Sequence, residues 1–243
     1  MSREHVFSAG LFREEFVTLV GFPFLNGSTK RLPVNAVVHK CLCKKHNELL
    51  SPADEAAIDV ANAMRRLSDW GTVRQRSAIK RPTLRELVVD GPGFERWLLK
   101  TAITLSRAHP GEARDWNPPL EVRQAAFGMG ALPMGCGLAV VAKVGSKLEF
   151  GEKFLAAFIR DKTSEQAVAI LFNFLGWTFA LSWDRPFSQF QPTEVDGVLL
   201  ERENFAPRVE KLLRADTQTM LRFTWTSRLS STQRAILEKL RSR

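Results

Sequence analysis

The sequence predicts an α+β fold with an extended N-terminal part, a helical middle and a β-rich C-terminal part. Three observations predict it. Gly and Pro interrupt the first fifty residues, apolar residues follow helical spacing in the middle, and short β-prone runs alternate with turn residues after residue 126. The composition, 44% hydrophobic and 25% charged over 243 residues, is typical of a globular protein. We expect three segments, 1–70, 71–125 and 126–243.

Two strong helices are expected in the middle of the chain. Ser51 is suited to an N-cap, Pro52 to the first turn and Asp54 to the capping-box position. Apolar residues keep helical spacing from there to Trp70. A second helix is predicted over residues 94–108, because a glycine precedes this apolar stretch and a proline follows it.

The third segment predicts an antiparallel meander that ends in helices. Gly, Pro, Asp or Ser separate most of its β-prone runs, as expected for strands joined by turns. Helical spacing then returns at residues 208–214 and from Ser231 to the terminus. The predicted strands are 138–144, 154–160, 167–174, 177–183 and 198–201.

The positive charge is concentrated in two stretches. The chain carries a net charge of +9, and residues 65–107 and 205–243 each carry a net charge of +6. Such stretches favour a polyanionic partner and predict contacts with a phosphate backbone. Two helices with solvated arginine faces would give the same pattern, and charge alone leaves both interpretations open. The predicted nucleic-acid contacts are Arg65, Arg66, Arg74, Arg76, Lys80 and Arg81.

Cysteine usage and hydropathy predict a cytoplasmic protein with no membrane partner. Three cysteines do not make a disulfide framework. No apolar run reaches the roughly 20 residues of a membrane span, and the N-terminus lacks the pattern of a signal peptide. The absence of tyrosine excludes a tyrosine nucleophile.

The chemically informative residues lie in the first fifty. Glu4 and His5 form an acidic–histidine pair, and Asn35 lies within a strand-like stretch at 34–38. The run C-L-C-K-K-H-N then occupies residues 41–47, directly before the first expected helix.

This order resembles the HNH (ββα-metal) nucleases. In that family a D/E-H pair on one strand is followed by a loop, an Asn that begins the second strand, and a C-x-x-C-[HN] turn into a helix. The resemblance covers about residues 1–60. It implies that 1–70 is an HNH-like ββα-metal module in an endonuclease that hydrolyses nucleic acid, DNA rather than RNA. Residues 94–100, F-E-R-W-L-L-K, also resemble a helix of bacterial proteins that carry this module.

The resemblance assigns a role to each residue of the pattern. His5 is the expected general base, and a histidine with a pKa near ~6.5 suits that role at neutral pH. Glu4 and Asn47 are expected to hold a catalytic divalent ion, Mg²⁺ or Mn²⁺, and Asn35 to orient His5 or its loop. His46 is either a metal ligand or a replacement for the second cysteine of the family.

Compared with the family pattern, the sequence offers an incomplete set of ligands for a structural zinc ion. Zinc needs four ligands, and this segment offers Cys41, Cys43, His46 and His39 without the upstream C-x-x-C of zinc-stapled members. A shortened site, a knuckle that has lost its metal, and missing upstream ligands all remain open. A degenerate HNH-like module that binds nucleic acid or protein is therefore the alternative function. The third segment is a possible protein-binding region in either case.

The remaining cysteine, histidine and tryptophans are interpreted as structural. Cys136 is expected to be buried and His109 to lie in a loop at a helix end. Core packing is expected for Trp97, Trp177 and Trp183, whereas Trp70, Trp116 and Trp225 lie near arginines and either pack or stack on bases.

Overall fold

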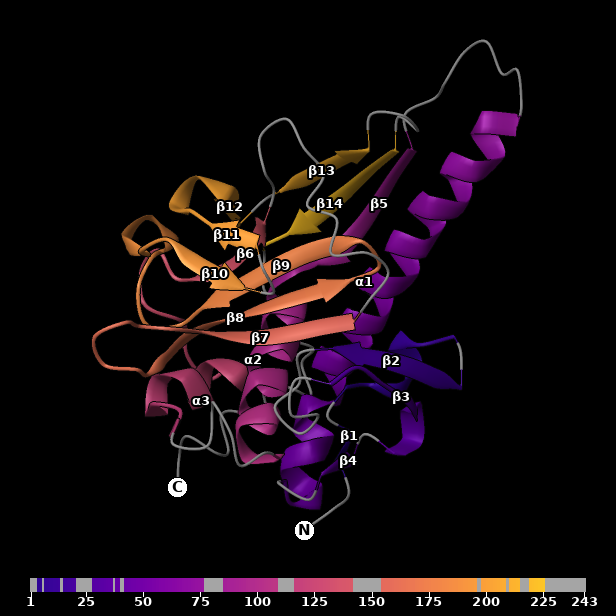
Figure 1. The fold of residues 1–243 in the computed structure, drawn as a ribbon. Coiled ribbons are helices and arrows are strands. Elements are labelled where there is room, and N and C mark those ends of the chain that lie inside the picture. Colours follow the sequence, from indigo (N-terminus) through magenta and orange to yellow (C-terminus); the bar gives the residue numbers. More distant parts are fainter. Residues whose placement is uncertain are drawn as a thin grey trace.

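The computed structural model shows an α+β fold (Figure 1). Within the residues it describes there are three α-helices, α1 (Lys44–Arg76), α2 (Gly91–Ala108) and α3 (Leu120–Ala126). The described residues are 4–5, 7–13, 15–20, 28–36, 38–39, 42–76, 85–108, 116–141, 154–195, 198–208, 210–214 and 219–225.

A seven-stranded sheet forms the centre of the molecule. Its pairs are antiparallel except for β2 and β7, which run parallel. Three of the five strands of the predicted meander, β7, β8 and β9, are consecutive neighbours, and β7 and β8 have the predicted bounds. The other two depart from the meander, because β6 pairs with β9 and Val198–Leu200 pairs with Thr193–Val195 in a separate sheet. In sheet order, the strands are β12 (Phe205–Pro207), β6 (Gly137–Val141), β9 (Trp177–Ser182), β8 (Ala167–Phe174), β7 (Phe154–Arg160), β2 (Phe16–Val20) and β3 (Lys30–Pro33).

Smaller strand pairs and 3₁₀ turns surround this sheet. A three-stranded sheet has the order β13–β14–β5, with β14 and β5 parallel. Its strands are β13 (Lys211–Arg214), β14 (Thr219–Thr224) and β5 (Arg85–Asp90). The two-stranded pairs are β1 (Glu4–His5) with β4 (Val38–His39) and β10 (Thr193–Val195) with β11 (Val198–Leu200). The 3₁₀ turns are η1 (Ala9–Leu11), η3 (Val34–Ala36), η4 (Phe187–Gln189) and η5 (Arg202–Asn204).

Both faces of the central sheet are covered at its middle strands. Ile170 and Phe172 of β8 belong to a core that also contains buried residues of α1 and α2, on the side where Figure 1 shows α2 and α3. Leu171 belongs to a second core on the opposite face, where the rings of Phe187 and Phe205 stack with centroids 4.4 Å apart. Because both faces are apolar, every residue of β8 is buried.

The main core crosses the expected segment boundaries. Val17 and Leu19 of β2, Ala57 of α1 and Leu98 of α2 share it with Phe179 of β9. Strands β2 and β3 also lie in the same sheet as β6–β9. The boundaries expected near residues 70 and 125 therefore do not separate independent cores.

The first helix begins earlier than predicted. Its first residue is Lys44, so Ser51 and Pro52 lie inside α1 and the predicted N-cap at Ser51 is wrong. Proline removes one helical hydrogen bond. Buried Ala53 and Ala57 on the following turns pack into the main core, and that burial favours continuation of the helix past the proline.

Two further predictions about elements are wrong. Residues 208–214 were expected to be helical, but Leu212 and Leu213 lie in β13, which pairs antiparallel with β14. The expected helical middle also contains β5, whose last residue, Asp90, accepts a hydrogen bond from the Gly93 amide at 3.1 Å and so caps α2. The helix predicted from Ser231 lies outside the described residues.

Most described tryptophans pack as expected. Trp97 and Trp183 are buried, and Trp116 is buried with its ring 4.4 Å from that of Trp183. Trp177 and Trp225 are partly buried against the same core. The side chain of Trp70 lies outside the described residues. Among the helices that the structure describes, none combines the length and apolar character that a membrane span requires.

Candidate site at the start of α1

Most of the predicted catalytic and metal-binding residues belong to β1, β4 and the first turn of α1, or lie next to them in the chain. In the antiparallel pair, Glu4 lies opposite His39 and His5 opposite Val38. Since α1 begins at Lys44, five residues after His39, its start lies at most about 18 Å from the end of β4. Figure 1 shows β1, β4 and the first turns of α1 at the same end of the molecule.

A buried polar network fixes the segment that follows β1. The Ser8 hydroxyl donates to Asp54 of α1, and the Trp97 indole nitrogen donates to the Ser8 oxygen at 3.1 Å. The Lys100 ammonium, only 3% exposed, donates to both carboxylate oxygens of Asp54 at 2.7 and 2.9 Å. Phe7, one residue before Ser8, is buried in the main core. The backbone beside His5 is thus tied to α1 and α2.

Trp97 and Lys100 of this network belong to the F-E-R-W-L-L-K stretch at residues 94–100, whose other polar residues also bind neighbouring elements. Besides Trp97 and Lys100, the Glu95 carboxylate accepts a hydrogen bond from the Leu138 amide at 2.9 Å. The Arg96 Nε donates to the Ala126 carbonyl at 3.2 Å. Each polar residue of the stretch therefore holds α2 to a different element. The sequence contains these residues but no signal for their partners, which lie 30 to 89 positions away.

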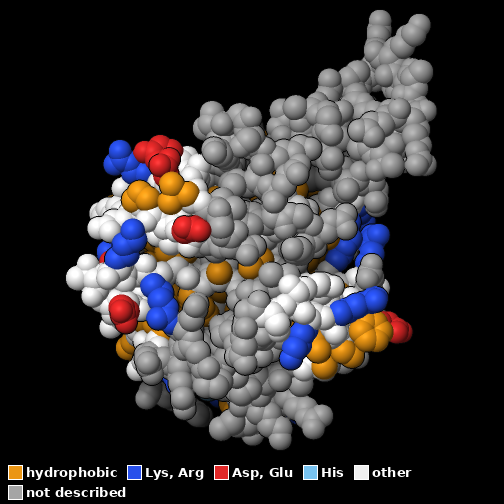
Figure 2. Space-filling model, in the orientation of Figure 1, with side chains coloured by type: hydrophobic (Ala, Val, Ile, Leu, Met, Phe, Trp, Pro, Cys, Tyr) orange, Lys and Arg blue, Asp and Glu red, His pale blue; other side chains and the backbone are white. Residues whose placement is uncertain are grey.

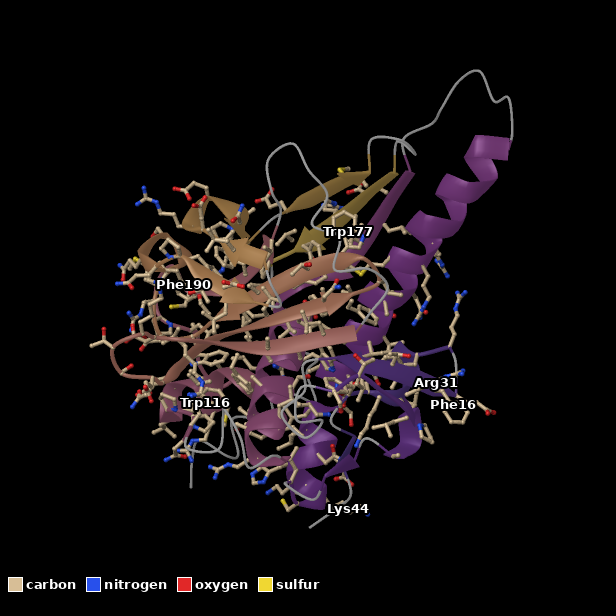
Figure 3. All side chains as sticks on the ribbon, viewed as in Figure 1. Phe16, Arg31, Lys44, Trp116, Trp177 and Phe190 are labelled. Atoms are coloured by element: carbon tan, nitrogen blue, oxygen red, sulfur yellow. The ribbon has the colours of Figure 1, made fainter. Side chains whose placement is uncertain are left out.

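Two potential metal donors lie side by side at the start of α1. Cys43 Sγ is 3.1 Å from His46 Nδ1, and both side chains are exposed. Asn47 is partly exposed, and its amide donates to the Cys43 carbonyl at 3.0 Å. The ring of His46 also contacts Phe127, which follows α3, with centroids 5.4 Å apart. Figure 3 marks this end of the helix with Lys44.

The described donors supply half of a zinc site. A structural zinc takes four ligands, and Cys43 with His46 gives two. Within the described part of the chain, no group of three or more His, Cys, Asp and Glu side chains is close enough to hold a metal. The side chains of the other predicted donors and catalytic residues lie outside that part: Glu4, His5, Asn35, His39 and Cys41.

The backbone places Asn35 differently from the prediction. It lies in the 3₁₀ turn η3, so the strand-like stretch expected at residues 34–38 is a turn followed by the two-residue strand β4. Asn35 precedes β4 by three residues, and in the resembling family an asparagine begins this strand. Pairing of β4 with β1 therefore does not require Asn35 to be in the strand.

Arg65, a predicted nucleic-acid contact, has a structural role. It is 9% exposed, and its guanidinium donates to the Leu11 carbonyl of η1 and to Asn62 Oδ1 at 3.3 Å. Burial, with a smaller contribution from the nearby charge of Arg13, lowers its pKa. Arg66 is exposed on the same helix. The side chains of Arg74 and Arg76, and all of Lys80 and Arg81, lie outside the described residues.

Cys136 packs in the interior as predicted. It is 2% exposed and belongs to the main core. Burial raises the pKa of its thiol, and the nearby hydroxyl of Ser182 partly offsets this shift. A buried thiol with a raised pKa is poorly suited to nucleophilic chemistry. His109, expected in a loop, lies outside the described residues.

In the described backbone, β1 and β4 form a strand pair, and α1 follows them in the chain. The acidic–histidine pair lies on the first strand, a second strand pairs with it, and the cysteine–histidine turn leads into a helix. Comparison of the chain with family models, curated proteins and solved structures gives no match.

Proposed function

We propose that the chain is a metal-dependent endonuclease of the HNH type that hydrolyses phosphodiester bonds in DNA. The observation that carries this proposal is the antiparallel pairing of β1 with β4 immediately before α1. This is the strand–strand–helix order of the family that the sequence resembles. The long insertion between the two strands belongs to the central sheet through β2 and β3, and it leaves the pairing intact.

Each predicted residue has one task in this proposal. His5 accepts the proton of the attacking water, and Asn35 orients His5 or its loop. Glu4 and Asn47 would hold a divalent ion, which would supply positive charge to stabilise the phosphate and the leaving oxygen. Cys43 and His46, with Cys41, are the candidate ligands of a structural zinc ion. The contact between Cys43 and His46 supports a shared role at the helix start.

A cleavage assay with His5→Ala tests the proposal. Purified protein is incubated with supercoiled plasmid or single-stranded circular DNA and Mg²⁺, Mn²⁺, Ni²⁺ or Zn²⁺. We expect the wild type to cut, and His5→Ala to lose cleavage by a factor of 10² to 10⁴, about the usual contribution of a general base. The thermal midpoint of the variant should stay close to that of the wild type.

His109→Ala is the matched control, because it removes a histidine just beyond the end of α2. It should cut like the wild type. Cleavage by His5→Ala at the wild-type rate would contradict the role of His5, and no cleavage with any of the four metals would contradict the nuclease assignment.

A degenerate HNH-like module is the second candidate. The observation that favours it is His46, which stands beside Cys43 at the position of the second cysteine of the family pattern. This candidate predicts salt-sensitive binding of nucleic acid without turnover, and the same affinity in His5→Ala. Metal content measured on the purified protein separates a zinc-bound module from a metal-free one.

A further inference from the structure

An exposed aromatic side chain stands on the β2–β3 hairpin at one edge of the central sheet. Residues of β2 alternate, with Phe16 and Thr18 exposed and Val17 and Leu19 buried. Phe16 is 42% exposed, and it is the only aromatic residue among the large hydrophobic side chains exposed in the described part of the chain. Figure 3 shows Phe16 and Arg31 projecting together from the side of the molecule.

Arg31 lies on the Phe16 ring. Its guanidinium carbon is 5.2 Å from the ring centroid, within the range of a cation–π contact. The strand register explains the contact, because Arg31 pairs with Thr18 and is diagonal to Phe16 across the hairpin. The exposed fraction of Phe16 is measured with Arg31 in this position, so the ring retains surface for another planar group.

Arg31 is the cation that the register places on the same face as Phe16. Lys30 is exposed as well, but it pairs with Leu19 and so lies on the opposite face. Among the described residues next to Phe16 in the chain, Arg13 and Glu15 are exposed. In Figure 2 lysine and arginine side chains and an acidic side chain lie beside exposed apolar groups on the right side of the molecule. An exposed ring with an arginine on the same face is a combination that proteins use to bind unpaired nucleic-acid strands.

Protection of an edge strand does not explain this surface. Strand β3 ends the order of the described seven-stranded sheet, and charged residues and proline on such a strand discourage pairing with another chain. That accounts for Lys30, Arg31 and Pro33. It does not account for Phe16 on the neighbouring strand, because an exposed apolar ring favours association.

We propose that the β2–β3 hairpin binds single-stranded nucleic acid, with Phe16 stacking on an unpaired base and Arg31 contacting the phosphates. Bases in a duplex are already stacked on each other, so a stacking side chain selects unpaired strands. This inference rests on the proposed function for its choice of nucleic acid, and it names unpaired strands as the substrate class. A stacked ring tolerates any base, so we expect no strong sequence preference.

Binding is measured by fluorescence anisotropy in EDTA, where cleavage does not occur. The probes are a labelled oligo(dT) of about 16 nucleotides, an abasic strand of the same length, and a duplex of the same length. We expect the wild type to bind oligo(dT) more tightly than either of the others. Phe16→Leu should weaken binding of oligo(dT) at least about fivefold without affecting the abasic strand, whereas Phe16→Trp should retain binding.

Arg31→Gln separates the phosphate contact from stacking. It should reduce the slope of log K against log salt concentration by about 0.7, the value expected for one phosphate contact on a single strand. Leu120→Ala and Arg123→Gln, both exposed on α3, are the matched controls and should bind like the wild type. Thermal melts of all variants establish that they are folded.

The result that would overturn the inference is equal affinity for oligo(dT) and the abasic strand, equal or tighter binding of the duplex, or wild-type affinity in Phe16→Leu. Its failure is distinct from failure of the proposed function. Metal-free binding that follows these expectations without any cleavage would leave the hairpin inference standing and remove the nuclease. Cleavage by the wild type, together with unchanged binding in Phe16→Leu, would support the nuclease and overturn the hairpin inference.

Discussion

Glu95 is a carboxylate held between α2 and the start of β6. Burial raises its pKa, and the hydrogen bond from the Leu138 amide and the nearby charge of Arg208 partly offset that shift. This arrangement also favours glycine at position 137, because a Cβ there would lie 2.6 Å from Glu95 Oε2. The contact therefore constrains both residues.

The raised pKa of Glu95 makes stability depend on pH. The folded state favours the protonated carboxyl. The contribution of Glu95 to the free energy of unfolding is therefore complete below its ordinary pKa of 4.5, and it is lost as the pH rises through the folded-state pKa. Glu95→Gln keeps a hydrogen-bond acceptor but does not ionise. We expect the variant to gain stability relative to the wild type between pH 4 and pH 8 in urea unfolding experiments.

Glu121→Gln is the control for this experiment, because Glu121 is exposed in the first turn of α3. The difference in free energy of unfolding between Glu121→Gln and the wild type should change much less between pH 4 and pH 8. The prediction is contradicted if the free energy of unfolding of Glu95→Gln, relative to the wild type, stays constant or falls as the pH rises. Either result would show that burial does not destabilise the ionised carboxylate.

At the scale of elements, the close contact between α1 and α2 requires glycine at position 93, because glycine has no Cβ. A Cβ at this position would lie 2.6 Å from Ala56 Cβ of α1 and 2.6 Å from Asp90 Oδ2, the oxygen beside the one that caps α2. Gly93→Ala should therefore lower the free energy of unfolding by about 1–3 kcal/mol, although alanine is the better helix former.

Urea unfolding measures this loss. Gly130→Ala is the matched control, since its nearest neighbour would be Gln124 Cβ at 3.5 Å, an ordinary contact. An unchanged midpoint in Gly93→Ala would mean that α1 and α2 separate slightly without loss of packing.

The elements also show which parts of the fold the sequence can predict. Residues 154–160 and 167–174 are predicted to the residue, because each is an apolar run bounded by turn residues. Residues 208–214 are not, since Leu212 and Leu213 suit a helix or a strand and their state is decided by pairing with β14. The start of α1 is missed for a similar reason: Ser51 and Pro52 form a good local start signal, but packing of later turns favours a longer helix.

The candidate site divides in the same way. The order of the pair Glu4–His5 and the turn from Cys43 to His46 is visible in the sequence, because those residues are local motifs. The network that anchors Ser8, three residues after His5, is not visible in the sequence, since Ser8 contacts Asp54 and Trp97 only after the chain has folded. The Phe16–Arg31 pair needs the strand register and so could not be predicted either.

At the scale of the whole molecule, the buried ion pair of Asp54 and Lys100 links α1 and α2 within a core that includes all three expected segments. A shared core of this kind predicts one cooperative unfolding transition rather than separate transitions for each segment. Tryptophan fluorescence and far-UV circular dichroism should therefore give the same urea midpoint.

Lys100→Met tests this cooperativity, because it removes the buried cation and leaves the Asp54 carboxylate without its ion pair. Breaking a buried pair costs about 3–5 kcal/mol, and we expect about 3 kcal/mol because the Asp54 side chain is still 22% exposed. In one cooperative unit both probes must shift together by this amount. Lys44→Met, which breaks only an exposed pair with Glu48, should shift neither. Two separated transitions in Lys100→Met would mean that the N-terminal site and the β-rich region unfold independently, so that substrate held at β2–β3 would not be rigidly placed relative to the start of α1.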